Sequence, residues 1–480
     1  MTSQAMDSNT PETKKNGMIK FSIKLIIGLI IGFGIALIKP PQGLTVQAMW
    51  FLGILCAGIY FIAVNIAEEH IVGILMLVFI VGLKVVDFKT AFSGYSTGTW
   101  FLVLGAFGIG AALSKTGLLT RISVAIAKKF PATFRGRVSA LMVAGMVVAP
   151  TMPSTSAKSL ILTPLSVDLG GEMGYKPKSR PATGLFMASW LPNGLITTLF
   201  FSGMVFGPLL AGMVQPEYRD QFTWIQWFVN ALPWAIVTII GLYIAILVLY
   251  KPKESDIAEN IVVKESIAAS PMSKNEKISL SVLVLTLLLW ITGKWTGLSN
   301  EIVAMFAFAS LALFKVIDKK DLGSRIAWNA LIFLGAIFGL SSMFSTLKID
   351  KWFSNILSGV MNPLLSKTVL FIIILCIAVY LLRSIILSQT VAVTLFFLVL
   401  APLVQKAGIN AWVLGFIIAC SINVWHLFPQ NVQFLTGYYA ADGGNWASFP
   451  ETAKMSFIFM IVNIIALLVS IPYWKLLGLL

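Results

Sequence analysis

The sequence predicts an all-α integral membrane protein with about eleven transmembrane helices and two re-entrant hairpins, built as an inverted repeat of two five-helix units. Composition is the first reason: 58% of the residues are apolar, 11% are charged, and the mean hydropathy is +0.88, outside the range of soluble domains. The second is a pair of polar breaks in apolar stretches, Pro-Ser-Thr-Ser at 153–156 and Ser-Gln-Thr at 388–390. Unwound polar backbone at membrane depth is tolerated only where it is buried or lines a cavity, so paired breaks point to a transport site.

The transmembrane spans follow from length, because a hydrocarbon core of ~30 Å needs roughly 20 apolar residues in a helix. Segments of this kind lie near residues 19–38, 46–64, 71–86, 97–114, 182–212, 226–249, 278–293, 299–315, 329–346, 411–437 and 455–479. Residues 1–18 are polar at first and lack the small-residue cleavage site of a signal peptide, so we expect a cytoplasmic tail.

Two further apolar segments, 138–167 and 368–404, are predicted to be the hairpins. Basic residues flank the first on both sides, which by the positive-inside rule places both of its ends in the cytoplasm: Arg121, Lys128, Lys129, Arg135 and Arg137 before it, and Lys176, Lys178 and Arg180 after it. Its expected arms, Val138–Val148 and Ser159–Leu169, would each be ~16 Å long, too short to cross. The second hairpin would enter from the outside.

An internal repeat supports this arrangement. Leu-Gly-Ala at 104–106 returns at 334–336, Ser-Thr-Ser at 154–156 corresponds to Ser-Gln-Thr at 388–390, and Pro-Asn-Gly at 192–194 corresponds to Pro-Gln-Asn at 429–431. A unit with an odd number of spans must be inverted in its second copy, which brings both hairpin tips to the midplane. We therefore expect a tail at 1–18, the first helix and first repeat at 19–250, a cytoplasmic linker at 251–277, and the second repeat at 278–480. The N-terminus would lie inside and the C-terminus outside.

The polar groups near the two breaks suit an anion. The embedded charges, Lys158 and Arg383, are positive, and half-helices expected to start at Ser159, Leu195, Val391 and Val432 would point N–H groups into the cavity. Side chains that can donate hydrogen bonds lie at the same breaks: Ser154, Thr155, Ser156, Ser388 and Thr390 with hydroxyls, and Asn193, Gln389 and Asn431 with amides.

Structural alternatives exist for each of these residues. Hydroxyls in membrane helices often bond only to their own backbone, and Pro192 and Pro429 could simply kink helices. Lys158 could pair with a carbonyl, Arg383 could face another helix, and His426 could be a packing residue instead of a proton relay.

The other chemistry-bearing residues indicate no enzyme and no cofactor. Cys56, Cys376 and Cys420 lack metal-ligand spacing, and the chain shows neither a catalytic-triad pattern nor a phosphate-binding loop. Much of the net charge of +15 lies in loops between spans, where it sets topology, so no nucleic-acid partner is expected.

These motifs resemble the divalent anion/sodium symporter family of di- and tricarboxylate and sulfate transporters. The shared features are two hairpins with a hydroxyl triplet at each tip, a helix broken near Pro and Asn after each hairpin, and a basic loop after Leu-Ser-Lys-Thr-Gly-Leu at 113–118. The resemblance implies a homodimer in a bacterial inner membrane that moves its substrate as an elevator. It implies substrate contacts at Thr155, Ser156, Gly194, Gln389, Thr390 and Pro429, and sodium coordination by Ser154, Thr155, Gly194 and Gln389.

Both tips depart from the Ser-Asn-Thr triplet of that family. The first reads Ser154-Thr155-Ser156 and the second Ser388-Gln389-Thr390, so both asparagines are missing. The sequence therefore leaves sodium symport and anion exchange both open, with a C4 dicarboxylate or citrate as the expected substrate. Transport of sulfate or another inorganic anion, and an anion channel, are the alternatives.

Overall fold

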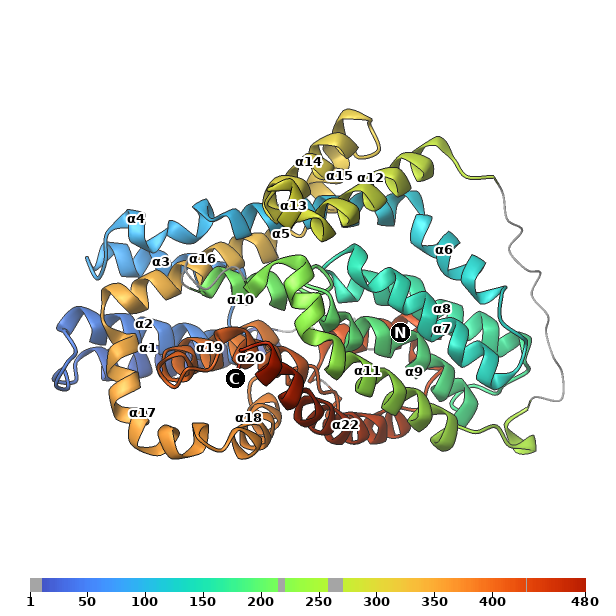
Figure 1. The fold of residues 1–480 in the computed structure, drawn as a ribbon. Helices are drawn as coiled ribbons and strands as arrows, with labels where there is room; N and C mark the ends of the chain where they lie inside the picture. Colours follow the sequence, from blue (N-terminus) through green and yellow to red (C-terminus); the bar gives the residue numbers. More distant parts are fainter. Residues whose placement is uncertain (1–10, 215–220, 258–270, 429) are drawn as a thin grey trace. The chain divides into compact units, whose positions relative to one another are not determined.

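The computed structural model describes residues 11–214, 221–257, 271–428 and 430–480. These residues fold into helices joined by turns and short loops, and the only β pairing among them is an isolated bridge between Tyr175 and Ile257. The all-α prediction is confirmed (Figure 1). Several of the described helices are long and apolar enough to span a membrane: Gly17–Ala36, Val46–Ala63, Gly98–Thr116, Trp224–Leu249, Trp328–Thr346, Gln389–Lys406 and Phe449–Leu476.

The helices of the first half run in the following order: α1 Pro11–Ala36, α2 Val46–Ala63, α3 Glu69–Gly82, α4 Phe88–Ala91, α5 Gly98–Thr116, α6 Leu118–Ala127, α7 Phe134–Val148, α8 Thr155–Glu172, α9 Arg180–Gly194, α10 Phe206–Met213 and α11 Trp224–Leu249. Those of the second half are α12 Lys274–Ile291, α13 Gly293–Thr296, α14 Asn300–Leu313, α15 Lys319–Ser324, α16 Trp328–Thr346, α17 Ile349–Leu365, α18 Thr368–Arg383, α19 Gln389–Lys406, α20 Ala411–Ser421, α21 Val432–Ala440 and α22 Phe449–Leu476.

The order of elements repeats between the two halves. Helix α5 begins at Gly98 and α16 begins at Trp328, an offset of 230 residues, and both are 19 residues long. The offset is 234 residues for α8 and α19, which begin at Thr155 and Gln389. Pairs of helices separated by a break, α9 with α10 and α20 with α21, follow the hairpins in both halves. The motif spacing in the sequence therefore corresponds to a structural repeat.

Two compact units make up the chain, and each contains segments of both halves. One comprises residues 1–97 and 328–357, and the other comprises residues 98–327 and 358–480. The second unit contains both hairpins and both broken helices. Residues 1–10 of the predicted tail and 258–270 of the predicted linker lie outside the described residues.

The arms of the first hairpin are longer than the sequence suggested. Helices α7 and α8 have 15 and 18 residues, which correspond to ~22 Å and ~27 Å along the helix axis, still less than the ~30 Å of a hydrocarbon core. What defines the hairpin is packing, because α7 and α8 both lie along α9. In the second half, α18 and α19 both pack against α20 in the same way.

Two helices of ten or more residues were not anticipated. Helix α6 follows Gly117, which has a positive φ of 72°, and helix α17 lies between α16 and the second hairpin. Both occupy corresponding places in the repeat. Each has apolar residues on one side only, so a search for continuous apolar runs overlooks them.

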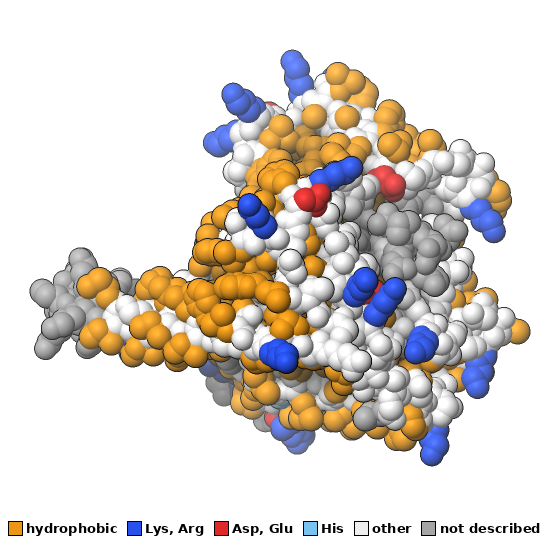
Figure 2. Space-filling view, turned by 90° about the vertical axis from the view of Figure 1, so that its left-hand side faces the viewer, with side chains coloured by type: hydrophobic (Ala, Val, Ile, Leu, Met, Phe, Trp, Pro, Cys, Tyr) orange, Lys and Arg blue, Asp and Glu red, His pale blue; other side chains and the backbone are white. Residues whose placement is uncertain are grey.

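The surface is hydrophobic over broad areas, as expected of a chain embedded in lipid. Large side chains of α1 and α3 such as Ile30, Phe33 and Val78 are half or more exposed. Figure 2 shows such side chains over much of one face, with Lys and Arg scattered among them.

Candidate functional site

The tip of the first hairpin presents a hydroxyl that has no partner among the described residues. The Oγ of Ser154 accepts a hydrogen bond from the backbone N–H of Ala157 at 3.2 Å and so caps α8. Thr155, the next residue, is 2% exposed, and its Oγ1 makes no hydrogen bond within the described part of the chain. Ser156 is half-buried. Helix α8 therefore begins at Thr155, four residues before the predicted start at Ser159, and its first turn follows directly from the tip.

Lys158 links this tip to the break that follows α9 by hydrogen bonds. Its side chain is fully buried, and its Nζ donates to the carbonyl oxygens of Ala149 at 3.0 Å and Gly203 at 2.7 Å, and to the Oγ1 of Thr197 at 2.7 Å. Three acceptors match the three N–H bonds of an ammonium group, so the surroundings suit the charged lysine. The lysine stays in the interior and does not extend towards water.

The break after α9 differs from the prediction of a half-helix starting at Leu195. Helix α9 ends at Gly194, Leu195 has non-helical φ and ψ of −126° and −60°, and α10 starts only at Phe206. The chain between them folds back tightly at Gly203, where an added Cβ would lie 2.4 Å from the carbonyl oxygen of Thr197. This close approach turns the Gly203 carbonyl towards Lys158.

Asn193 and Gly194 end α9 beside this break. Asn193 is fully buried, donates from Nδ2 to the carbonyl of Ser189 at 3.3 Å, and has no partner for Oδ1 among the described residues. Gly194 lies against Trp190, whose ring leaves no room for a Cβ. An amide oxygen in this position is available to a ligand that carries a donor or to a cation.

The second tip repeats the capping arrangement of the first. Ser388 Oγ accepts from the N–H of Val391 at 3.3 Å, and α19 begins at Gln389, two residues before the predicted start at Val391. Gln389 donates from Nε2 to the Oδ1 of Asn423 at 3.1 Å, and Thr390 is half-buried. The two serines of the triplets thus share one structural role at the starts of α8 and α19.

Arg383 links the second tip to the break after α20, as Lys158 links the first tip to the break after α9. Its guanidinium is fully buried and donates only to backbone carbonyls among the described residues. Two belong to the tip, Ile386 and Leu387, both at 2.6 Å, and two belong to the break after α20, Ile422 at 3.0 Å and Gln430. Nearby, the Nε2 of His426 lies 3.3 Å from the Oγ of Ser384.

Asn423 is a site residue that sequence reasoning missed. Like Asn193 it is fully buried near the end of its helix, and its Nδ2 donates to the carbonyl four residues earlier, Ala419, at 3.2 Å. Its offset from Asn193 is 230 residues, the same as that of the Leu-Gly-Ala repeat, and this signal could have identified it. The sequence comparison instead paired the first break with 429–431.

Asn431 caps the half-helix that follows the second break. Its Oδ1 accepts from the N–H of Phe434 at 2.9 Å, and its Nδ2 donates to the carbonyl of Asn423 at 3.2 Å. The predicted half-helix start at Val432 is correct. Pro429, another predicted contact, lies outside the described residues.

The two breaks meet in the interior of their unit. The ring of Trp190 lies 4.7 Å from that of Trp425 and 5.1 Å from that of Phe434. Helix α8 packs against α21, and α10 packs against α19, so each hairpin contacts the broken helix of the other half. No cluster of three or more His, Cys, Asp or Glu side chains that could hold a metal ion occurs in the described residues.

Buried fixed cations and capped half-helices at two equivalent breaks, with an unpaired hydroxyl at the first tip, are features of a carrier of small anions. Comparison with known proteins agrees. The model of the sodium:sulfate symporter transmembrane region matches residues 20–480, so the chain belongs to this family of divalent anion transporters.

Individual relatives are transporters of organic anions or membrane proteins by name. The chain is 30% identical over 355 residues to the inner membrane protein YbhI of Escherichia coli, covering 71% of this chain and 73% of YbhI. It is 24% identical to the chloroplastic dicarboxylate transporter 2 of Spinacia oleracea, over 96% of this chain and 83% of that protein. It is 27% identical to an L-tartrate/succinate antiporter of Escherichia coli, over 66% of each.

A solved structure shares the fold. The YdaH transporter of Alcanivorax borkumensis superposes with a TM-score of 0.57 over 82% of this chain and 88% of that one, at 14% identity. The integral membrane prediction and the family resemblance are thus confirmed.

Proposed function

We propose that this protein exchanges one small dicarboxylate for another across the membrane without sodium coupling. The observation that carries the proposal is the pair of buried cations. Lys158 and Arg383 each bind carbonyl oxygens from a hairpin tip and from the break beside it. The family resemblance assigns bound sodium ions to oxygens of the tips and breaks. In this protein the positive side chains of Lys158 and Arg383 bind carbonyl oxygens of the tips and breaks instead.

The side chains present do not suit an additional sodium ion at these carbonyls. An ion bound at the same oxygens would lie within a few ångströms of Lys158 or Arg383, in a region of low dielectric constant where like charges repel strongly. Of the predicted sodium ligands, Ser154 already caps α8. Thr155 and Gly194 remain beside the tip and the break, and their positions favour contact with the anion.

The positive charges of Lys158 and Arg383 give a physical reason for the exchange of one dicarboxylate for another. Two positive side chains at the site compensate the two negative charges of a dicarboxylate, so the loaded site carries no net charge. The empty site retains both positive charges, and moving them through the bilayer interior is costly. Only the loaded form would cross, which couples the outward movement of one anion to the inward movement of another.

The substrate class follows from the paired arrangement. Each tip offers hydroxyls and half-helix N–H groups, so two tips suit a molecule with a carboxylate at each end. Thr155, Ser156 and Asn193 would bind one end, and Gln389, Thr390 and Asn423 the other. The names of the chloroplastic dicarboxylate transporters and of the tartrate/succinate antiporter support this class over sulfate.

Movement of the site would follow the elevator scheme of the family, in which the hairpins and broken helices slide past a dimeric scaffold. The cross-packing of α8 on α21 and of α10 on α19 supports this proposal, because it joins both hairpins and both breaks into one body.

The test is uptake of radiolabelled succinate into sodium-free liposomes that contain the purified protein and are either preloaded with unlabelled succinate or empty. We expect rapid uptake only into preloaded vesicles, and no change when sodium chloride replaces potassium chloride outside. Uptake into empty vesicles that requires external sodium would establish a symporter and overturn the proposal. Labelled sulfate, tested in the same vesicles, distinguishes the inorganic anion.

A further inference from the structure

A groove lies between α12 and α14 in the unit that contains the hairpins. Its volume is about 250 Å³. Helix α12 contributes one face and α14 contributes positions three, four and seven residues apart, as a helix side requires. The lining residues are Ser281, Val282, Leu285, Thr286 and Leu289 from α12, Val303, Phe306, Ala307 and Ser310 from α14, and Phe314 directly after α14. Leu285, Phe306 and Phe314 are about half exposed, so the groove is open at the surface.

The two helices run antiparallel, which gives the groove two different ends. The Nε1 of Trp290, at the end of α12, donates to the carbonyl of Asn300, at the start of α14, at 3.0 Å. At the other end Leu283 packs in one cluster with Leu311 and Val316. The groove therefore runs from Ser281 and Phe314 at one end to Leu289 and Val303 at the other.

Lysines surround the end near Ser281 and Phe314. Lys277 is one helical turn before Ser281, Lys274 is one turn further, and Lys315 directly follows Phe314. All three are exposed, and no carboxylate among the described residues forms an ion pair with them.

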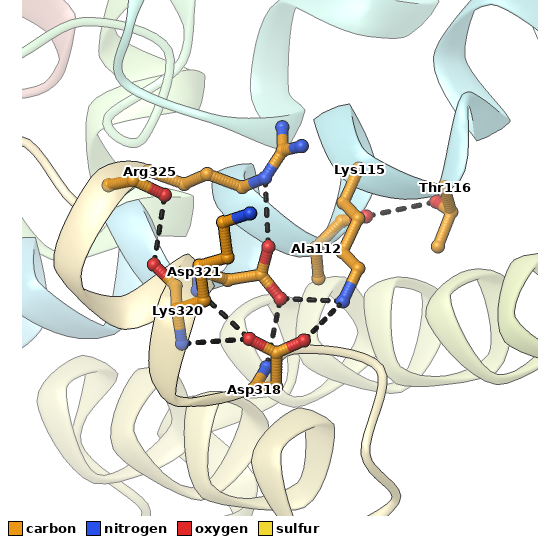
Figure 3. A network of polar contacts seen from close by, with 8 residues as sticks. Ala112, Lys115, Thr116, Asp318, Lys320, Asp321 and Arg325 are labelled. Atoms are coloured by element: carbon orange, nitrogen blue, oxygen red, sulfur yellow. Dashed lines mark hydrogen bonds and ion pairs between the residues drawn. The ribbon is translucent and has the colours of Figure 1, made fainter.

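The acidic side chains at this end are already paired. Asp321 binds Lys115 at 2.5 Å and Arg325 at 2.9 Å, Asp318 binds Lys115 at 3.2 Å, and Glu276 binds Arg121 at 2.6 Å. Figure 3 shows the first two carboxylates turned towards Lys115 and Arg325 at the base of α15. The exposed lysines are thus left to bind an external anion.

We propose that this groove binds an anionic phospholipid, with one acyl chain between α12 and α14 and the phosphate at Lys274, Lys277 and Lys315. The dimensions agree: Ser281 to Leu289 spans ~12 Å along the helix, close to the ~15 Å of one leaflet of a ~30 Å hydrocarbon core. Basic residues on the predicted cytoplasmic side, next to an apolar intramembrane groove, are the chemistry that recognises anionic headgroups.

The site has a structural consequence for the neighbouring elements. Helix α12 is joined to α6 by the pair of Arg121 with Glu276, and α15 is joined to α5 through Lys115. A lipid wedged between α12 and α14 would brace both connections, so binding stabilises the folded protein by mass action.

The test is binding of phosphatidylglycerol to the delipidated, full-length protein in detergent, measured by native mass spectrometry, with phosphatidylcholine as the neutral comparison. Three variants are needed: Lys277→Gln with Lys315→Gln at the headgroup end, Ser281→Leu with Ser310→Leu to fill the groove, and Lys294→Gln as the matched control at the opposite end of the same helix pair. A lysine near an anionic lipid surface is worth about a fivefold factor, so the double lysine variant should bind phosphatidylglycerol roughly 25-fold more weakly.

We expect the groove-filling variant to lose binding as well, and Lys294→Gln to bind as the wild type does. Phosphatidylcholine should bind weakly to every form. Equal phosphatidylglycerol binding by all forms would overturn the proposal. The proposal would also be overturned if the groove-filling variant changed from dimer to monomer while its lipid affinity stayed the same. The groove would then hold a second copy of the chain. Circular dichroism and thermal unfolding establish that each variant is folded.

Discussion

The Nζ of Lys158 lies 2.7 Å from the carbonyl oxygen of Gly203, so one buried cation joins the first hairpin to the break after α9. The same nitrogen binds the carbonyl of Ala149 on the tip itself. Arg383 repeats this at the second hairpin with different chemistry, a guanidinium that comes before its tip instead of an ammonium that comes after it. Each half thus has one buried positive charge between its hairpin tip and its break, although the two residues occupy different positions in the repeat.

Replacing Lys158 tests the role of this charge. Lys158→Met keeps an unbranched side chain one atom shorter but leaves the Ala149 and Gly203 carbonyls without their cation, so we expect exchange to fall to background and the free energy of unfolding to drop by about 2–4 kcal/mol. Counterflow in proteoliposomes and thermal unfolding in detergent measure the two effects. Lys406→Met, at an exposed lysine of α19, is the matched control and should behave as the wild type. Exchange at the normal rate in Lys158→Met would remove the lysine from the mechanism.

Arg383→Lys keeps the charge but changes the geometry. The guanidinium of Arg383 serves four carbonyls, whereas an ammonium has only three N–H bonds, so at least one buried carbonyl loses its partner. We expect a loss of about 1–3 kcal/mol in the free energy of unfolding and slower exchange. Arg135→Lys, at an exposed arginine, controls for the substitution itself. Unfolding of Arg383→Lys at the wild-type temperature would show that the fourth carbonyl does not need its donor.

The tip hydroxyls should contribute to binding and little to folding. Thr155 Oγ1 has no hydrogen-bond partner among the described residues, so Thr155→Val combined with Thr390→Val should leave the melting temperature nearly unchanged while abolishing uptake. Thr436→Val is the control, because among the described residues that hydroxyl bonds only to the carbonyl of Val432 in its own helix. Normal KM and rate in the double variant would exclude the tips from the substrate site.

Features that depend on side-chain composition could be predicted from the sequence. Apolar length identified most spans, and the polar triplets identified both tips, because lipid imposes a strong compositional constraint on each. The partners of Lys158 and Arg383 could not be predicted, since Ala149, Gly203 and Ile422 act through backbone carbonyls that any residue possesses. Helices α6 and α17 were missed because an amphipathic helix has no continuous apolar run.

The ion-pair network at the base of α15 predicts a pH dependence of stability. Burial raises the pKa of Asp321, but hydrogen bonds from Lys115, the Asp318 N–H and Arg325 outweigh it and lower that pKa to about 2. A depressed carboxyl pKa stabilises the fold above the unfolded value near 4, and this contribution is lost as the pH falls towards 2. Asp321→Asn should therefore lower the free energy of unfolding by about 1–2 kcal/mol at pH 7, a range that includes screening by nearby solvent. It should also remove much of the pH dependence of unfolding between about pH 4 and pH 2.

The matched control for Asp321 is Asp318→Asn, whose side chain is 59% exposed and should contribute less. Thermal unfolding of the two variants across that pH range separates them. Equal destabilisation by both would mean that the buried position of Asp321 adds nothing.

The packing of the first hairpin on α9 depends on Gly145. A Cβ added at this position of α7 would lie 2.5 Å from the Cβ of Pro192, closer than two carbon atoms can approach without movement of the backbone. Because both atoms belong to rigid parts of their helices, Gly145→Ala should push the hairpin arm away from the break and cost about 1–3 kcal/mol. Gly171→Ala, in α8, is the control: its Cβ would meet nothing within 4 Å, so the gain in helix propensity should stabilise the protein by up to about 1 kcal/mol.

The two glycine variants should also differ in transport. Gly145→Ala displaces the arm that leads to the tip, so the exchange rate should fall together with the melting temperature, whereas Gly171→Ala should exchange at the wild-type rate. Both quantities can be measured on the same preparations. A Gly145→Ala protein as stable and as active as the wild type would mean that α7 and α9 are further apart in the membrane than the 2.5 Å approach indicates.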